Sequence, residues 1–202
     1  MRMLWGAGFI LAGLLLLMYP QLEKKAADHK QEQLIEAFEQ LSDVGRKIDE
    51  AEPPHAEPAN VQQDAVELLD GARGVIRIPK IDLNMMIFEG SDESALRKGV
   101  GMIEPEKEIG KNNVGLAGHR AVTYGKQFNR LDELAPNDEI EIETKTGRYV
   151  FVVTKAFVVD RTKVEVLADQ KEPLLTLVTC TPIGKKNPTD RLIVQARLKR
   201  LG

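Results

Sequence analysis

The apolar positions divide the chain into three parts. Residues 3–19 carry no charge and are almost wholly apolar. A helix over them, at about 1.5 Å per residue, would span roughly 26 Å, the short end of what crosses a bilayer. The run continues as Tyr19-Pro20-Gln21, without the small-residue site at which a secretory leader is cleaved. We therefore predict a retained transmembrane anchor at residues 1–20.

The second part, residues 21–73, shows helical periodicity followed by prolines. Leu34, Phe38 and Leu41 recur at helical spacing, with Ile35 beside them. This spacing predicts an amphipathic stalk helix, and a partly disordered spacer is the alternative. The proline-containing stretch at 51–58 predicts a linker.

The third part, residues 74–202, consists of short runs rich in β-branched residues. Residues 139–144 alternate with period two and are joined through Lys145-Thr146-Gly147 to the next run, which is typical of a hairpin. About eight short strands with few helices predict a mainly β fold, a closed, antiparallel-rich β-barrel. The strands are expected at 75–79, 81–88, 114–117, 139–144, 148–159, 174–179 and 192–198, with a short helix at 92–98 that Asp92 can cap.

Composition narrows the chemistry. The net charge of −3 gives no reason to expect nucleic-acid binding. The single cysteine, Cys180, excludes an intrachain disulfide and a multi-cysteine zinc site. A lone thiol is either a small buried apolar group or a reactive nucleophile. We predict no metal and no cofactor.

Three reactive side chains fall at predicted strand ends. Cys180 takes the last position of an apolar run that Pro182 interrupts, and His119 follows the run ending in Ala117-Gly118. Arg191 opens the run 192–198, so its guanidinium can reach the sulfur if the two runs lie side by side. An imidazole can promote thiolate formation and protonate a leaving amine, and a guanidinium suits an oxyanion. Each residue alone has an ordinary structural explanation, as a packed thiol, a hydrogen-bonded histidine or a solvated arginine.

The motifs around these residues resemble those of the sortases. Thr176-Leu177-Val178-Thr179-Cys180 matches the T-L-x-T-C motif, Leu116-Ala117-Gly118-His119-Arg120 the histidine motif, and Arg191-Leu192-Ile193-Val194 the arginine strand. The order of the three motifs agrees with that family, and the resemblance covers roughly residues 74–200. It implies an eight-stranded sortase barrel and a cysteine transpeptidase.

The resemblance also implies roles and partners. Cys180 would attack an L-P-x-T-type sorting sequence after its threonine, His119 would serve as acid and then base, and Arg191 would steady the oxyanion. The acceptor would be an amine of the cell wall or its precursor, and the clients would be surface proteins that carry the sorting sequence. The implied location is a Gram-positive cell membrane, with the N-terminus cytoplasmic and the barrel outside. The family positions that line the substrate groove fall on Ala117, Thr176, Val178 and Thr179, for which strand packing is the alternative.

Subclass and reaction type leave alternatives open. The segment 51–73 lacks an aromatic lid tripeptide and the stretch between Val159 and Leu174 is short, so the chain looks most like class D, with class E or a housekeeping enzyme as alternatives. The rival functions are a cysteine hydrolase that releases the acyl group to water and a non-catalytic, membrane-tethered binding barrel. An L,D-transpeptidase is disfavoured, because its compact histidine–cysteine cluster has no counterpart here.

Overall fold

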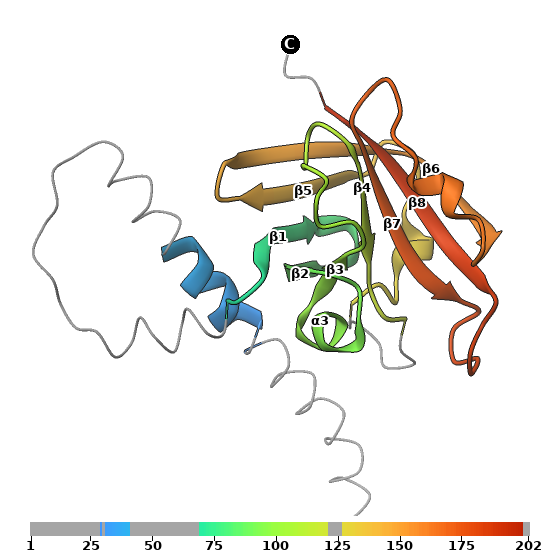
Figure 1. Cartoon of the computed structure of the whole chain (residues 1–202), viewed down its shortest axis with the longest axis horizontal. Helices are drawn as coiled ribbons and strands as arrows, with labels where there is room; N and C mark the ends of the chain where they lie inside the picture. The colour runs from blue at the N-terminus through green and yellow to red at the C-terminus, as the bar shows by residue number, and fades with distance from the viewer. Residues whose placement is uncertain (1–28, 30, 41–68, 121–126, 200–202) are drawn as a thin grey trace, which may run out of the picture.

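The computed structural model describes residues 29, 31–40, 69–120 and 127–199. A helix occupies residues 31–40, and eight strands with a few short helices follow (Figure 1). The strands are β1 (Ala72–Ile78), β2 (Leu83–Glu89), β3 (Val100–Met102), β4 (Asn113–Ala117), β5 (Glu139–Thr144), β6 (Gly147–Asp160), β7 (Leu174–Thr181) and β8 (Asp190–Leu198). The short helices are η1 (Pro79–Ile81), α3 (Glu93–Lys98), η2 (Leu131–Glu133) and η3 (Val164–Leu167).

The strands close into a barrel in the order β1-β2-β3-β4-β7-β8-β6-β5. The pairs β2–β3 and β4–β7 are parallel, and the other pairs are antiparallel. The prediction of a mainly β, closed barrel with few helices is confirmed. Parallel β4 and β7 are far apart in sequence, so this pairing brings two distant strand ends to the same end of the barrel.

Alternation along β4, β7 and β8 assigns one face of each strand to the core. The inward residues are Val114 and Leu116 on β4, Leu175 and Leu177 on β7, and Leu192, Val194 and Ala196 on β8. Because successive side chains point to opposite faces of a strand, the intervening positions face outward. Cys180 and Arg191 are among the outward positions.

Two local predictions need correction. Strand β3 was not predicted, because its three residues, Val100 to Met102, are too few to show a period. Cys180 is the penultimate residue of β7 and not the last, since Thr181 still pairs with Asp190 of β8 before Pro182 ends the ladder. The short helix was predicted correctly: Asp92 Oδ1 accepts a hydrogen bond from Ala95 N at 3.0 Å, the contact of an N-cap.

The helix at 31–40 does not stand free of the barrel. Leu34, Ile35 and Phe38 are buried in a cluster with β1, β2 and α3, and Figure 1 shows this helix beside β1 and β2. Gln31, at the start of this helix, binds two elements of the barrel domain: its amide nitrogen donates to Lys98 O of α3 at 2.6 Å, and its oxygen accepts from Met86 N of β2 at 3.2 Å. This part of the predicted stalk is therefore packed against the barrel, while Leu41 lies outside the described residues.

The predicted anchor, residues 1–20, also lies outside the described residues. Within the part of the chain that the structure describes, no helix is long and apolar enough to cross a membrane.

Candidate active site

The register of β4 and β7 places His119 and Cys180 level with each other. The ladder pairs Asn113 with Leu174 and continues in register to Ala117 and Val178. Beyond its end, Thr179 Oγ1 donates to Gly118 O at 2.8 Å and Arg120 Nη1 donates to Thr181 Oγ1 at 3.0 Å, both across 61 positions. His119 and Cys180 are separated by the same number of positions and lie between these two contacts.

Cys180 and Arg191 are brought together by the neighbouring antiparallel pair. They are direct partners in the β7–β8 register, and side chains directly opposite in such a pair have Cβ atoms roughly 4.5–5.5 Å apart on the same face. The Cys180 thiol is free and partly exposed. Three adjacent strands thus place a thiol, an imidazole and a guanidinium at one end of their outer face.

Arg191 is oriented by backbone oxygens. Its Nη1 donates to Pro188 O at 2.9 Å and to Asp190 O at 3.0 Å. Its other nitrogens have no acceptor among the described residues. The Arg191 charge also reaches Asp160 at the end of β6: hydrogen bonds from Thr162 are the main cause of the lowered pKa of Asp160, and the nearby arginines add to it.

His119 is held by its backbone and left open at its ring. Gly118 N donates to Val178 O, and His119 O accepts from Phe128 N, each at 3.1 Å. A Cβ at Gly118 would lie 2.7 Å from the buried Phe128 ring, so the close approach requires glycine here. The imidazole is 42% exposed, and its Nε2 lies 3.7 Å from a carboxylate oxygen of Glu93 in α3.

The structure separates the four predicted groove residues. Ala117 and Val178 are register partners, partly exposed, on the outward face beside Cys180. Thr176 is on the same face but is fully buried, and its hydroxyl donates to Asn113 Oδ1 at 2.7 Å. Thr179 is buried and bound to Gly118 O. Ala117 and Val178 are therefore partly open to solvent, whereas Thr176 and Thr179 are buried and hydrogen-bonded within the protein.

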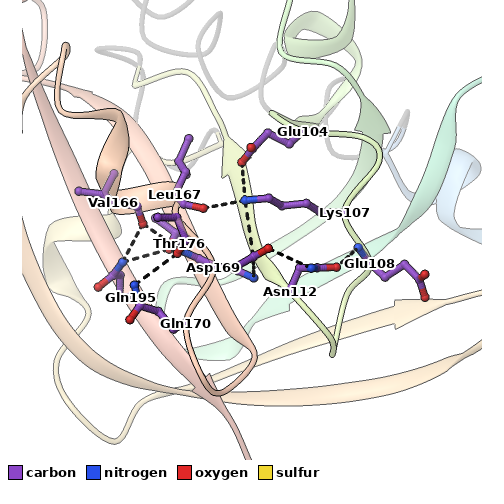
Figure 2. Close-up of polar contacts among 12 residues, drawn as sticks. Glu104, Lys107, Glu108, Asn112, Val166, Leu167, Asp169, Gln170, Thr176 and Gln195 are labelled. Carbon is purple, nitrogen blue, oxygen red and sulfur yellow. Dashed lines mark hydrogen bonds and ion pairs between the residues drawn. The ribbon is translucent and has the colours of Figure 1, made fainter.

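Thr176 is covered by the segment 161–173, which connects β6 to β7 and contains η3. Figure 2 shows how side chains from elsewhere hold this segment. Asn113 Nδ2 donates to Val166 O at 2.9 Å and to Ala168 O at 3.0 Å, and Gln195 Nε2 donates to Val166 O at 3.1 Å. Leu167 lies over Gly115, where a Cβ would approach its side chain to 2.6 Å. These contacts hold the segment over the outer face, at the end away from Cys180, where it forms a wall.

A largely covered lysine joins this segment to the loop between β3 and β4. Lys107 is 13% exposed, and its ammonium donates to Leu167 O at 2.6 Å and lies 2.8 Å from Glu104 and 3.7 Å from Asp169 (Figure 2). Asp169 in turn accepts from Asn113 N at 2.8 Å. Among the described residues, no group of three or more His, Cys, Asp or Glu side chains is arranged to hold a metal ion.

Sequence reasoning did not find Lys107, Asn113, Asp169 or Glu93. Their contacts link segments that are far apart in the chain, and none of them belongs to a motif. Only Asn113 gave a signal in the sequence, because it is a polar residue directly before the apolar run 114–117.

A closed barrel that carries Cys, His and Arg at the ends of three adjacent strands has the side chains expected of a cysteine enzyme of the acyl-transfer type. The sortase domain family matches residues 76–199. The chain therefore belongs to the sortase family, whose members are cysteine transpeptidases.

Curated relatives agree with this assignment. Sortase A of Bacillus anthracis is 30% identical over 152 residues, which cover 75% of this chain and 69% of that protein. Sortase A of Listeria monocytogenes is 30% identical over 122 residues, 60% of this chain and 52% of the relative. Sortase D of Bacillus subtilis is 33% identical over 116 residues, 56% of each chain. The match thus spans only about half the length of two of these relatives.

Solved structures show the same fold. The structure of Listeria monocytogenes sortase A covers 65% of this chain and 89% of its own, with a TM-score of 0.61 and 27% identity. A Clostridium perfringens sortase D5 covers 85% of this chain and 99% of its own, with a TM-score of 0.62 and 24% identity.

Proposed function

We propose that this chain is a membrane-anchored sortase that cleaves an L-P-x-T-type sorting sequence after its threonine and transfers the acyl group to an amine. The observation that carries the proposal is the common register of β4, β7 and β8. The β4–β7 register sets His119 level with Cys180, and in the β7–β8 pair Cys180 lies directly opposite Arg191. Family membership supports the reaction type.

In the first half-reaction, His119 takes the proton of Cys180 and the thiolate attacks the threonine carbonyl carbon. The carbonyl oxygen becomes an oxyanion, which the free nitrogens of Arg191 stabilise. When the intermediate collapses, the peptide C–N bond breaks and His119 returns the proton to the leaving amine. A thioester on Cys180 remains.

In the second half-reaction, an acceptor amine attacks the thioester carbonyl. His119 takes a proton from the amine, Arg191 again holds the oxyanion, and collapse releases the thiolate and a new amide bond. Glu93, 3.7 Å from the imidazole, faces the charge that His119 carries at these steps. Transfer instead of hydrolysis requires that the amine reach the thioester before water does.

We propose that Ala117 and Val178 line the substrate groove and that segment 161–173 bounds it. The proposed clients are surface proteins with the sorting sequence, and the proposed acceptor is an amine of peptidoglycan or its lipid-linked precursor. Residues 1–20 would anchor the chain with the N-terminus cytoplasmic and the barrel outside. We place the chain in class D, which the short segment 161–173 supports.

The test is mass spectrometry of products made by the purified full chain in detergent. The chain is incubated with a panel of L-P-x-T peptides and candidate amines, and the Cys180→Ala variant is the control. We expect ligated peptide to accumulate at the expense of hydrolysed peptide, and the variant to produce neither while keeping its fold, because only a partly exposed sulfur is lost. An amine panel that never changes the product would establish a hydrolase instead.

The location has its own test. Protease added to intact protoplasts should degrade the barrel, and deletion of residues 1–20 should move the protein to the soluble fraction. Protection of a barrel that detergent makes protease-sensitive would contradict the proposed orientation.

A further inference from the structure

Arg120 is a buried charge beside the active site to which the proposed reaction gives no role. It follows His119 directly, and its side chain is 8% exposed. Nη1 donates to Thr181 Oγ1 at 3.0 Å, and Nη2 lies 2.9 Å from a carboxylate oxygen of Asp132 in η2. One guanidinium thus joins the chain leaving β4, the last residue of β7 and η2.

Stability alone does not account for an arginine here. Its carboxylate partner, Asp132, is 56% exposed, so water screens an attraction that would otherwise offset the burial of the guanidinium. The Nε of Arg120 is buried with no acceptor among the described residues, which is a further cost. An apolar side chain would avoid both costs, so we look to the contacts of the guanidinium for a role besides stability.

Its place in the register indicates what that contribution is. The β4–β7 ladder ends at Ala117 and Val178, and the bond from Thr179 to Gly118 O is the last tie before the reactive pair. The bond from Arg120 to Thr181 is the only described hydrogen bond between the two segments beyond the pair. Among the described residues, this bond and the bond from Thr179 to Gly118 thus tie the two segments together on either side of His119 and Cys180.

We propose that Arg120 is a positioning residue that holds Thr181 so that Cys180 stays level with His119. The inference rests on the proposed function, because alignment matters only if thiol and imidazole exchange a proton. A planar guanidinium can serve Thr181 and Asp132 at once, which an ammonium cannot do with the same geometry. A displacement of roughly 1 Å between reacting groups can lower a rate about 10²-fold.

The experiment compares Arg120→Met with a matched control, Arg130→Met, in the full chain. Arg130 binds Glu133 of η2 through two nitrogens at 2.7 Å and Ile81 O at 3.1 Å. Both substitutions remove an arginine that pairs with an acid of η2, but only the first removes a hydrogen bond to Thr181. We expect Arg120→Met to lower kcat about 10–100-fold with KM changed less than about twofold. Arg130→Met should retain the kcat of the wild type.

Two further variants test the route of action. Arg120→Lys should recover part of kcat, since it keeps one donor. Thr181→Val should lower kcat in the same way as Arg120→Met, and the double variant should lose little more than the worse single variant, because the two residues act as a unit.

A second measurement does not depend on turnover: the rate at which iodoacetamide alkylates Cys180 at neutral pH. His119→Ala sets the unassisted rate. Arg120→Met should move toward that rate, while Arg130→Met stays at the wild-type rate. If the wild type neither cleaves nor transfers any sorting peptide, the proposed function fails and alkylation still decides the positioning role. A folded Arg120→Met variant that matches Arg130→Met in both measurements, or that raises KM alone, overturns the inference.

Discussion

The outer face of β4 and β7 has a covered end and an open end, and the same two strands form both. At the covered end Thr176 is fully buried, and its hydroxyl is bound by Asn113 and Gln195 beneath segment 161–173. At the open end, four positions along β7 on the same face, Cys180 is partly exposed and His119 is 42% exposed.

The two ends differ in how far their polar groups are hydrogen-bonded within the protein. Buried polar groups need partners, and a fully bonded network is rigid. The carbonyls of Val166, Leu167 and Ala168 all accept hydrogen bonds from side chains of other segments. At the open end, two nitrogens of Arg191 have no acceptor among the described residues, and the His119 ring is partly exposed. The covered end is therefore held by hydrogen bonds within the protein, whereas Cys180 and His119 at the open end lie partly exposed.

The largest expected effect follows from breaking the open end at Arg191. Arg191→Ala should lower kcat/KM by roughly 10²–10³, the usual loss for one oxyanion donor. Arg191→Lys should restore only part, because an ammonium cannot hold two acceptors in a fixed plane. The measurement is steady-state kinetics on a sorting peptide, with circular dichroism to confirm folding.

Arg197 provides the matched control for this prediction. It lies on β8, on the same outward face, but pairs with Leu174 at the covered end. Arg197→Ala should leave kcat/KM within about twofold of wild type, since surface substitutions away from special features change little. Near-wild-type activity in a folded Arg191→Ala variant would remove Arg191 from the mechanism.

An intermediate effect is expected from breaking the covered end at Asn113. Asn113→Ala removes the donor to Val166 O and Ala168 O and the acceptor of Thr176, all in a buried site. Leaving such groups unsatisfied should lower the free energy of unfolding by about 1–3 kcal/mol. KM should rise more than kcat falls, because the wall of the groove loosens while the reactive residues keep their register.

Asn112→Ala is the comparison for that variant. Asn112 donates to Asp169 at 3.1 Å and accepts from Glu108 N at 3.0 Å, and water can reach both contacts. Its loss should therefore cost less than the loss of Asn113, about 0.5 kcal/mol. Urea unfolding and steady-state kinetics would measure both variants. Equal losses of stability in the two would show that burial does not distinguish these contacts.

The barrel was predictable because its strands are long enough to show a pattern. Residues 139–144 alternate over a full strand, and the observed β5 has the same limits. The exception, β3, has three residues and includes Gly101. The spacing of Leu34 and Phe38 predicted a helix, but a helix period does not identify the surface on which the apolar side will pack. Its contact with β1, β2 and α3 was therefore not predicted.

The site was only partly predictable for the same physical reason. The pairing of Cys180 with Arg191 follows from two adjacent antiparallel strands, which sequence can suggest. The pairing of β4 with β7 joins segments 61 positions apart, so only the sortase motifs connected His119 to Cys180 in advance. The network around Lys107 and Asp169 depends on loop conformations, and no local pattern encodes them.

The smallest expected effect concerns pH at the covered end. The pKa of Asp169 is held below its ordinary value of 3.8, first by the hydrogen bond from Asn113 N and then by the Asn112 amide and the Lys107 charge. Because the folded pKa is the lower one, the contribution of Asp169 to stability is complete above about pH 5 and is lost as the pH falls below 3.8 and through the folded pKa.

Replacing the carboxylate should reproduce the acid state at every pH. The urea midpoint of the wild type should therefore exceed that of Asp169→Asn by a constant amount from pH 5 to 7, and this difference should shrink below pH 4. Subtracting the variant removes the parallel contributions of Asp160 and Glu143, whose pKa values are also lowered. A difference that does not change with pH down to 3 would mean that the charge of Asp169 does not hold segment 161–173 in place.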